Sequence, residues 1–154
     1  MLLKIRIAVL SLWLGIAALF SFVVAPAAFK ALPSRLLAGN VVNRVLGVTE
    51  IIGIIIGVLL LLLLWSAVRE RGRAFWFEGV TLAAMTLSMV ASKFVVSRSL
   101  HQLREQYGDA LSSLPLDHPA SAAFAEFHQL SVALRSFNLL ATLVLIVYLM
   151  RRPT

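Results

Sequence analysis

Residues 45–67 read VLGVTEIIGIIIGVLLLLLLWSA, and Glu50 is the only charged side chain among them. A helix needs ~20 apolar residues to cross the ~30 Å hydrocarbon core of a bilayer. Three further stretches have the same length and character, at residues 5–25, 75–97 and 131–150. Only helices and closed barrels satisfy every backbone hydrogen bond in lipid. The sequence therefore predicts an all-α fold: an integral membrane four-helix antiparallel bundle forming a single transmembrane domain over residues 1–154.

The composition supports a membrane protein and excludes several other classes. Of the 154 residues, 60% are hydrophobic and 14% are charged, whereas soluble domains carry ~25% charged residues. Cysteine is absent, which excludes disulfides, thiolate metal sites and thiol catalysis. The net charge of +7 comes from basic residues at segment ends, where they orient spans and meet anionic headgroups. We expect membrane lipid as a partner and no nucleic acid; a homo-oligomer or a larger membrane complex stays open.

Basic residues also indicate the orientation. We call the side that holds both termini and the 68–74 connection side one, and the side that holds the 26–44 and 98–130 connections side two. Seven Lys and Arg fall on side one and five on side two, once Lys93 and Arg135 are placed inside the membrane. Positive charge in short loops marks the cytoplasmic side. We expect a multi-pass inner (plasma) membrane protein with cytoplasmic termini, whose first span is a retained signal anchor.

The side-two connections are predicted to contain further helix. Ser34 can cap a short helix that reaches Arg44. Leucines at helical spacing predict an amphipathic helical extension between the third and fourth spans, over roughly Ser99 to Leu111, either continuing the third span or lying at the interface. Gly108 weakens this extension and Pro115 and Pro119 end it. Asp117 or His118 can cap the next helix.

Charged side chains inside spans are rare and usually face inward, so they point to a site. Glu50, Lys93 and Arg135 each fall roughly 5–8 Å below the side-two surface, at 1.5 Å per residue. We expect Glu50 to be buried against Arg135 or, failing that, Lys93; alternatively, Lys93 extends to the interface. If both cations face inward, their excess charge suits an anionic headgroup or a small anion. The candidate intramembrane polar cluster comprises Asn43, Glu50, Lys93, His128, Arg135 and Asn138.

Two spans carry seams that favour helix packing. On the fourth span, polar residues recur every three or four positions and so share one face; this face is either a helix–helix seam or the wall of a cavity. On the second span, Gly53 and Gly57 form a GxxxG pattern, which permits close helix approach. The residues of the fourth-span seam are His128, Ser131, Arg135, Asn138 and Thr142.

No sequence motif indicates catalysis or a cofactor. The chain has no Walker, HExxH, GxSxG or dinucleotide-binding pattern. His101, His118 and His128 have no second histidine three or four positions away, so a metal site would need ligands from separate segments. We therefore predict no catalytic residue, no metal site and no cofactor, and a colourless protein.

Several short motifs resemble a known family. They are Trp13-Leu14-Gly15, Ala25 to Phe29, Leu32-Pro33-Ser34, Ala38-Gly39, Asn43-Arg44, Phe127 to Ser131 and Asn138-Leu139-Leu140. The chain resembles the uncharacterised four-span bacterial family related to eukaryotic transmembrane protein 205. That family is distantly similar to copper-resistance protein D and to HemJ-type protoporphyrinogen oxidase, which implies a link to metal or haem. The HemJ type uses a histidine in the early spans, whereas no histidine precedes His101 here. By resemblance, Pro26, His128 and Asn138 occupy recurrent family positions.

Three functions follow from these observations. The leading hypothesis is a non-enzymatic integral inner-membrane protein that handles a metal, an ion or a lipid. The second is an accessory subunit of a larger membrane complex, and the third is a haem- or metal-dependent membrane enzyme.

Overall fold

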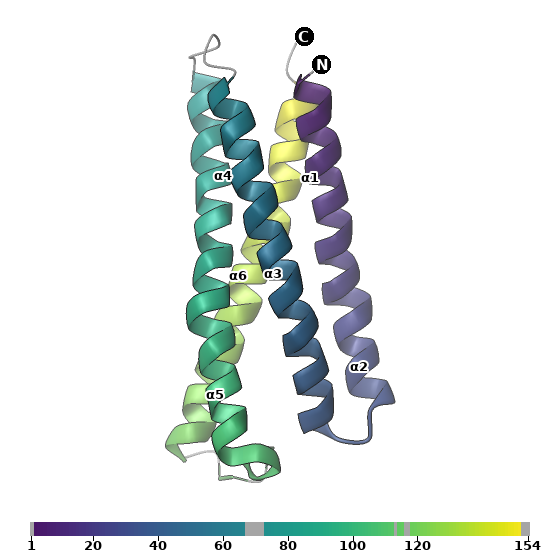
Figure 1. The fold of residues 1–154 in the computed structure, drawn as a ribbon, viewed down its shortest axis with the longest axis vertical. Helices are drawn as coiled ribbons and strands as arrows, with labels where there is room; N and C mark the ends of the chain where they lie inside the picture. Colours follow the sequence, from purple (N-terminus) through teal and green to yellow (C-terminus); the bar gives the residue numbers. More distant parts are fainter. Residues whose placement is uncertain (1, 67–72, 113, 116–117, 152–154) are drawn as a thin grey trace.

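Four long helical rods run side by side and alternate in direction, with both ends of the chain at the same end of the bundle (Figure 1). The structure, a computed structural model, describes residues 2–66, 73–112, 114–115 and 118–151. Within these residues, four helices are long and apolar enough to cross a membrane: Leu2–Ala31, Arg35–Trp65, Phe75–Tyr107 and Pro119–Met150. The predicted all-α bundle of membrane helices is confirmed.

The first rod continues past its expected end. It comprises α1 (Leu2–Leu19), a π-helical segment η1 (Phe20–Val24) and α2 (Ala25–Ala31). The span was expected to stop at residue 25, with Pro26 in a connection. Pro26 instead lies in the first turn of α2, where its missing N–H is tolerated. The wider π turn directly before it is the kind of break that lets a helix pass a proline.

The second rod, α3 (Arg35–Ser66), begins at a cap. The Leu37 backbone N–H donates to Ser34 Oγ at 3.1 Å, so Ser34 caps a helix as predicted. This helix does not stop at Arg44; it runs without interruption into the second span. Ala67, the expected last residue of that span, lies outside the described residues, as do Arg69 and Arg71 of the basic side-one connection.

The third rod carries the predicted extension. It comprises α4 (Arg73–Ala91), a second π segment η3 (Ser92–Ser97) and α5 (Arg98–Tyr107), followed by a 3-10 segment η4 (Gly108–Ser112). Thus the extension continues the third span. Leu100 is buried while Arg98, His101 and Glu105 are exposed, which makes α5 amphipathic. Gly108 ends α5 with a φ of 53°, a conformation that glycine adopts at little cost.

The fourth rod, α6 (Pro119–Met150), begins well before the expected residue 131. The Ala120 backbone N–H donates to His118 Nδ1 at 3.1 Å, so His118 is the cap. The alternative cap, Asp117, lies outside the described residues. A 32-residue helix is about 48 Å long at 1.5 Å per residue, longer than the ~30 Å hydrocarbon core. The surplus extends the bundle on side two.

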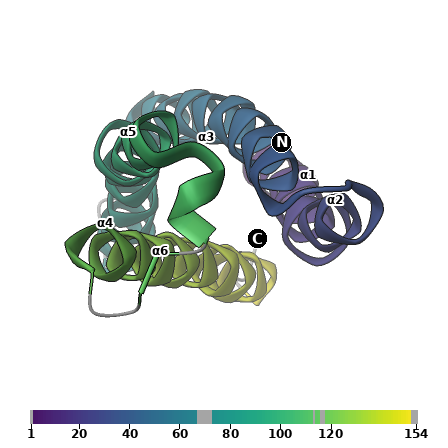
Figure 2. The same cartoon turned by 90° about the horizontal axis from the view of Figure 1, so that it is seen from below.

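The rods form a ring in which α1 contacts α3 and α6, and α4 also contacts α3 and α6 (Figure 2). The side-one half of the interior contains an apolar cluster, with Leu10, Leu60, Leu82, Leu145 and Leu149 at its centre. Gly53 faces Met89 and Trp13, and Gly57 faces Thr86. The two glycines therefore lie where neighbouring helices approach α3 most closely, as the GxxxG pattern predicts.

Candidate functional site

Glu50 lies in the interior of the side-two half of the bundle and is only 2% exposed. Its carboxylate accepts hydrogen bonds from two serines on the third rod. Ser92 Oγ donates to Glu50 Oε1, and Ser97 Oγ lies 3.1 Å from both carboxylate oxygens. A buried charged group needs partners of this kind because it has lost its hydration.

The π segment η3 explains how two serines five positions apart reach one carboxylate. In an α-helix, residues five apart point about 140° away from one another, because each residue turns the helix by about 100°. In a π turn, residues i and i+5 are joined by a backbone hydrogen bond and lie one turn apart. Ser92 and Ser97 are the first and last residues of η3, so the wide turn places both on the face that meets α3.

The expected ion pair of Glu50 is absent from the described residues. Within 4 Å, neither Arg135 nor Lys93 pairs with Glu50; the ion pairs described are Arg6–Glu78 and His101–Glu105. The prediction of burial was right and that of a direct cation partner was wrong. The serine hydroxyls donate to the carboxylate in place of a cation. The Arg135 guanidinium instead makes a cation–π contact, with its carbon 4.9 Å from the centroid of the Phe20 ring. Both cations remain close enough to act on Glu50 electrostatically.

The seam on the fourth span is only partly buried. Asn138 is 4% exposed, and its Nδ2 donates to Met85 O at 3.2 Å and to Ser88 Oγ at 2.5 Å. Thr142 is fully buried. His128, by contrast, is exposed and its ring lies parallel to that of Phe124, 6.2 Å between centroids. His128 is therefore not part of the buried cluster.

A small chamber lies against Glu50. Its volume is about 20 Å³. Three buried polar atoms of residues lining it lack a hydrogen-bond partner: Trp13 Nε1, Arg135 Nη2 and Asn138 Oδ1. Unpartnered buried polar atoms are uncommon and call for a physical explanation. The complete lining is Trp13, Glu50, Ser88, Met89, Ser92, Leu134, Arg135 and Asn138.

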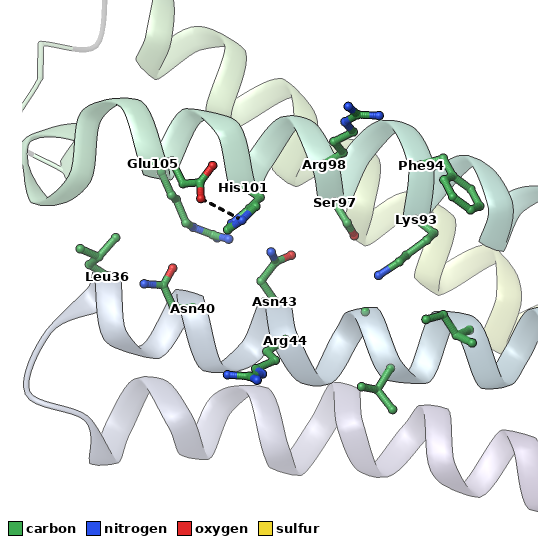
Figure 3. Close-up of a pocket in the computed structure, with 14 residues that line it drawn as sticks. Leu36, Asn40, Asn43, Arg44, Lys93, Phe94, Ser97, Arg98, His101 and Glu105 are labelled. Atoms are coloured by element: carbon green, nitrogen blue, oxygen red, sulfur yellow. Dashed lines mark ion pairs between the residues drawn. The ribbon is translucent and has the colours of Figure 1, made fainter.

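A larger groove of about 850 Å³ runs between α3 and the η3–α5 part of the third rod. Lys93 and Ser97 point from the third rod toward α3, and Asn40 and Asn43 point from α3 toward the third rod (Figure 3). Ser97 thus joins the groove to the buried carboxylate. Of the six candidate cluster residues, Asn43 and Lys93 line the groove, whereas Glu50, Arg135 and Asn138 line the chamber.

Two glycines of α3 make room for cations in the groove. A Cβ at Gly47 would lie 2.7 Å from Lys93 Nζ, and one at Gly39 would lie 3.2 Å from Arg104 Nε. Gly39 and Gly47 are eight residues apart and so share one face of the helix. The Arg104 guanidinium carbon also lies 5.3 Å from the Phe124 ring centroid, a cation–π contact. Both cations are thereby held at the wall of the groove.

The groove is basic overall. Among the described residues that line it, Glu105 is the one that carries a carboxylate. Glu105 is exposed, and its Oε1 lies 3.2 Å from His101 Nε2. In Figure 3, Arg98 points away from α3, which places its head at the rim. The basic residues that line the groove are Arg44, Lys93, Arg98 and Arg104.

A second buried carboxylate, not anticipated from the sequence, lies at the opposite end of the bundle. Arg6 Nη1 donates to Glu78 Oε1 at 2.7 Å, and the two side chains are 5% and 1% exposed. Arg6 was expected to serve only as a side-one basic residue. The signal was present nevertheless, because Glu78 is an acidic residue within the apolar stretch 75–97.

Metal ligands do not converge among the residues that the structure describes. No three histidine, aspartate or glutamate side chains there lie close enough to hold a metal ion.

These features define an integral membrane protein of four long helices with a basic groove at one end. The chain belongs to the family described as "Domain of unknown function (DUF4149)", which matches residues 8–109. The match includes Glu50 and both walls of the groove but not Arg135 and Asn138 on α6. The chain is 37% identical over 102 residues to an "Uncharacterized protein" of Aquifex aeolicus (strain VF5), covering 66% of this chain and 70% of the relative. No solved structure matches the chain.

Proposed function

We propose that this protein is a non-enzymatic inner-membrane protein that binds the anionic headgroup of a phospholipid in the groove between α3 and α5. The observation that carries the proposal is an open groove lined by Arg44, Lys93, Arg98 and Arg104. Anionic headgroups are attracted to Lys and Arg near a membrane surface by about 1 kcal/mol per residue.

The depth of the groove follows from the exposed tryptophans at the other end of the bundle. Trp65 and Trp76 are 71% and 68% exposed near the side-one ends of α3 and α4. Tryptophan favours the membrane interface, so these two residues mark the side-one boundary. About 20 residues further along each helix, the opposite boundary falls near Val45 and Val96. The groove crosses that boundary: Ile51 and Phe94 lie on its hydrocarbon side, and Asn40 and Arg104 lie on its aqueous side.

The lining matches a headgroup followed by an acyl chain. Lys93 provides a compact ammonium at the deep end, and Arg104 provides a planar guanidinium toward the outer end. Asn40, Asn43 and Ser97 offer hydrogen bonds between them (Figure 3). Below the boundary, the apolar wall suits hydrocarbon; its residues are Val48, Ile51 and Phe94. This combination favours a lipid over a free anion, which would leave the apolar wall uncovered.

The membrane orientation and the family resemblance expected from the sequence both bear on this proposal. With cytoplasmic termini, as the basic residues favour, the groove opens toward the outer leaflet. The resemblance to transmembrane protein 205 and copper-resistance protein D implies a link to metal or haem, so the lipid ligand is inferred from the groove alone. An accessory role in a larger complex is compatible with the same headgroup site.

Lipid binding in nanodiscs tests the proposal. The full chain is placed in zwitterionic lipid, and a labelled anionic phospholipid is titrated in. Lys93→Gln and Arg104→Gln should each weaken binding about ten-fold or more, since a charge-assisted hydrogen bond contributes about 1.5–3 kcal/mol. Arg35→Gln is the matched control, because Arg35 is exposed and does not line the groove.

Two outcomes would contradict the proposal. Equal affinity of all four proteins for the anionic lipid would remove the groove as the site. If inorganic phosphate at millimolar concentration displaced the labelled lipid completely, the site would be one for a small anion instead.

A further inference from the structure

We propose that Glu50 is a proton-binding site whose occupancy is linked to the groove, so that protonation of Glu50 strengthens the binding of a phosphate-bearing ligand there. This inference rests on the proposed function for the identity of the ligand. The proton site itself stands on the geometry around Glu50.

Glu50 is placed to exchange a proton. Glu50 is 2% exposed and its carboxylate is held by two hydroxyl groups rather than by a cation. The charged groups that act on it are Arg135 from α6 and Lys93 from η3, and neither forms a direct ion pair with it among the described residues. Trp13, which faces the chamber from α1, carries no charge.

The hydrogen bonds of Glu50 fit either protonation state. In the charged form, Ser92 and Ser97 donate to the carboxylate. On protonation, a hydronium ion in side-two water gives one proton to Oε2: its O–H bond breaks, the Oε2–H bond of a hydroxyl forms, and one water molecule is left. Ser97 Oγ, at 3.1 Å from Oε2, can then accept from that hydroxyl, while Oε1 still accepts from Ser92. A serine hydroxyl can donate or accept, so the cluster need not rearrange.

The chamber beside Glu50 supplies a place for one water. Its volume of about 20 Å³ exceeds the ~10–15 Å³ that a single water requires. Trp13 Nε1 and Arg135 Nη2 are unpartnered donors, and Asn138 Oδ1 is an unpartnered acceptor. One water molecule can accept two hydrogen bonds and donate two. Trp13 and Arg135 supply the two donors to it, and Asn138 and the Glu50 carboxyl group supply the two acceptors. That water would give Glu50 a neighbour for proton exchange.

The link to the groove runs through Lys93 and Ser97. Both line the groove, and both act on Glu50. A phosphate in the groove attracts the Lys93 ammonium and adds negative charge near the carboxylate, so it favours the neutral form of Glu50. By reciprocity, a neutral Glu50 leaves Lys93 free for the phosphate and strengthens its binding. The sign follows: affinity rises as the pH falls through the titration of Glu50.

The decisive experiment measures anionic-lipid affinity against pH for wild type and Glu50→Gln in nanodiscs. Glutamine resembles the neutral acid, so Glu50→Gln should bind at least about five-fold more tightly than wild type at high pH, the lower end of typical coupling. Its affinity should also lose the Glu50-dependent change with pH. Ser97→Ala, which removes the shared hydroxyl, should reduce the pH dependence.

One confounding group is controlled directly. His101 also lines the groove, and its Nε2 lies 3.2 Å from Glu105 Oε1, so it is a second ionisable group beside the ligand. His101→Gln should keep the pH dependence that Glu50→Gln removes. If His101→Gln abolishes it instead, or if Glu50→Gln binds no more tightly than wild type at any pH, the link is wrong.

An infrared titration in zwitterionic lipid separates the proton site from the lipid site. The carbonyl band of a protonated carboxylic acid should appear as the pH falls and be missing in Glu50→Gln. Absence of a Glu50-dependent band would overturn the proton site. If the band appears but no variant binds anionic lipid, the proposed function and the link fail while the proton site stands.

Discussion

The two buried carboxylates lie at opposite ends of the bundle and are satisfied in opposite ways. Glu78, fully buried near side one, is held by the guanidinium of Arg6 at 2.7 Å. Glu50, 2% exposed near side two, is held by two serine hydroxyls and lies beside a chamber lined by residues with unpartnered polar atoms. The Arg6 guanidinium neutralises the charge of Glu78 directly, whereas the serine hydroxyls leave the charge of Glu50 without a direct counter-ion among the described residues. We therefore expect substitutions of Glu78 to affect mainly stability and substitutions of Glu50 to affect mainly the proposed ligand binding.

The largest effect is expected from breaking the side-one pair. Glu78→Gln leaves the Arg6 charge buried without its carboxylate, and breaking a buried pair in this way typically destabilises by about 3–5 kcal/mol. Unfolding in mild detergent, followed by circular dichroism, measures the loss. A loss below about 1 kcal/mol would show that Arg6 is hydrated and that the two ends do not differ.

Removing both charges sharpens the same point. Arg6→Met combined with Glu78→Met should recover most of the stability lost in Glu78→Gln, because no charge is then left buried and apolar side chains of similar volume replace the pair. The same unfolding assay checks this. Losses that simply add would indicate that the two side chains act independently.

Glu50→Gln should affect stability much less than Glu78→Gln. The amide oxygen of glutamine can still accept from Ser92 and Ser97, so the loss should not exceed about 1.5 kcal/mol, the upper range for one neutral hydrogen bond. Thermal unfolding of the two variants side by side gives the comparison. An equal loss would mean that Glu50 is as essential to the fold as Glu78.

The smallest stability effects are expected from a matched pair of glycines, one at each end. A Cβ at Gly79 meets only Leu64 Cδ2 at 3.5 Å, an ordinary contact, whereas a Cβ at Gly47 meets the flexible end of Lys93 at 2.7 Å. Each alanine should change stability by under about 1 kcal/mol. Only Gly47→Ala should weaken anionic-lipid binding, because it displaces the ammonium. Loss of binding in both variants would contradict a site confined to side two.

The sequence predicted the membrane core of the fold better than its side-two end. Apolar runs such as 45–67 reveal the spans by composition alone. On side two, however, the helices continue past the apolar runs, and composition does not show where they end. Ser34 was correctly read as a cap, while the helix it starts joins the second span. Pro26 was placed in a connection because sequence spacing does not reveal the π turn that precedes it.

For the candidate site, the sequence predicted which residues share a layer but not which side chains contact one another. Counting residues placed Glu50, Lys93 and Arg135 in one layer, and Glu50 is buried there. Which partner reaches the carboxylate depends on helix rotation, and there the η3 turn overrides regular spacing. Ser92 and Ser97 are five positions apart, a spacing that a regular α-helix would place on different faces.

The η3 turn also sets which face α5 presents to its neighbours relative to α4. An α-helix advances about 100° per residue, and the wide turn of η3 takes up one residue more than an α turn does. If residues 92–97 kept their number but wound as a regular α-helix, the whole of α5 would turn about its axis relative to α4. That rotation would carry Arg104 away from Gly39 and the Phe124 ring. The contacts of an entire surface thus depend on one wide turn.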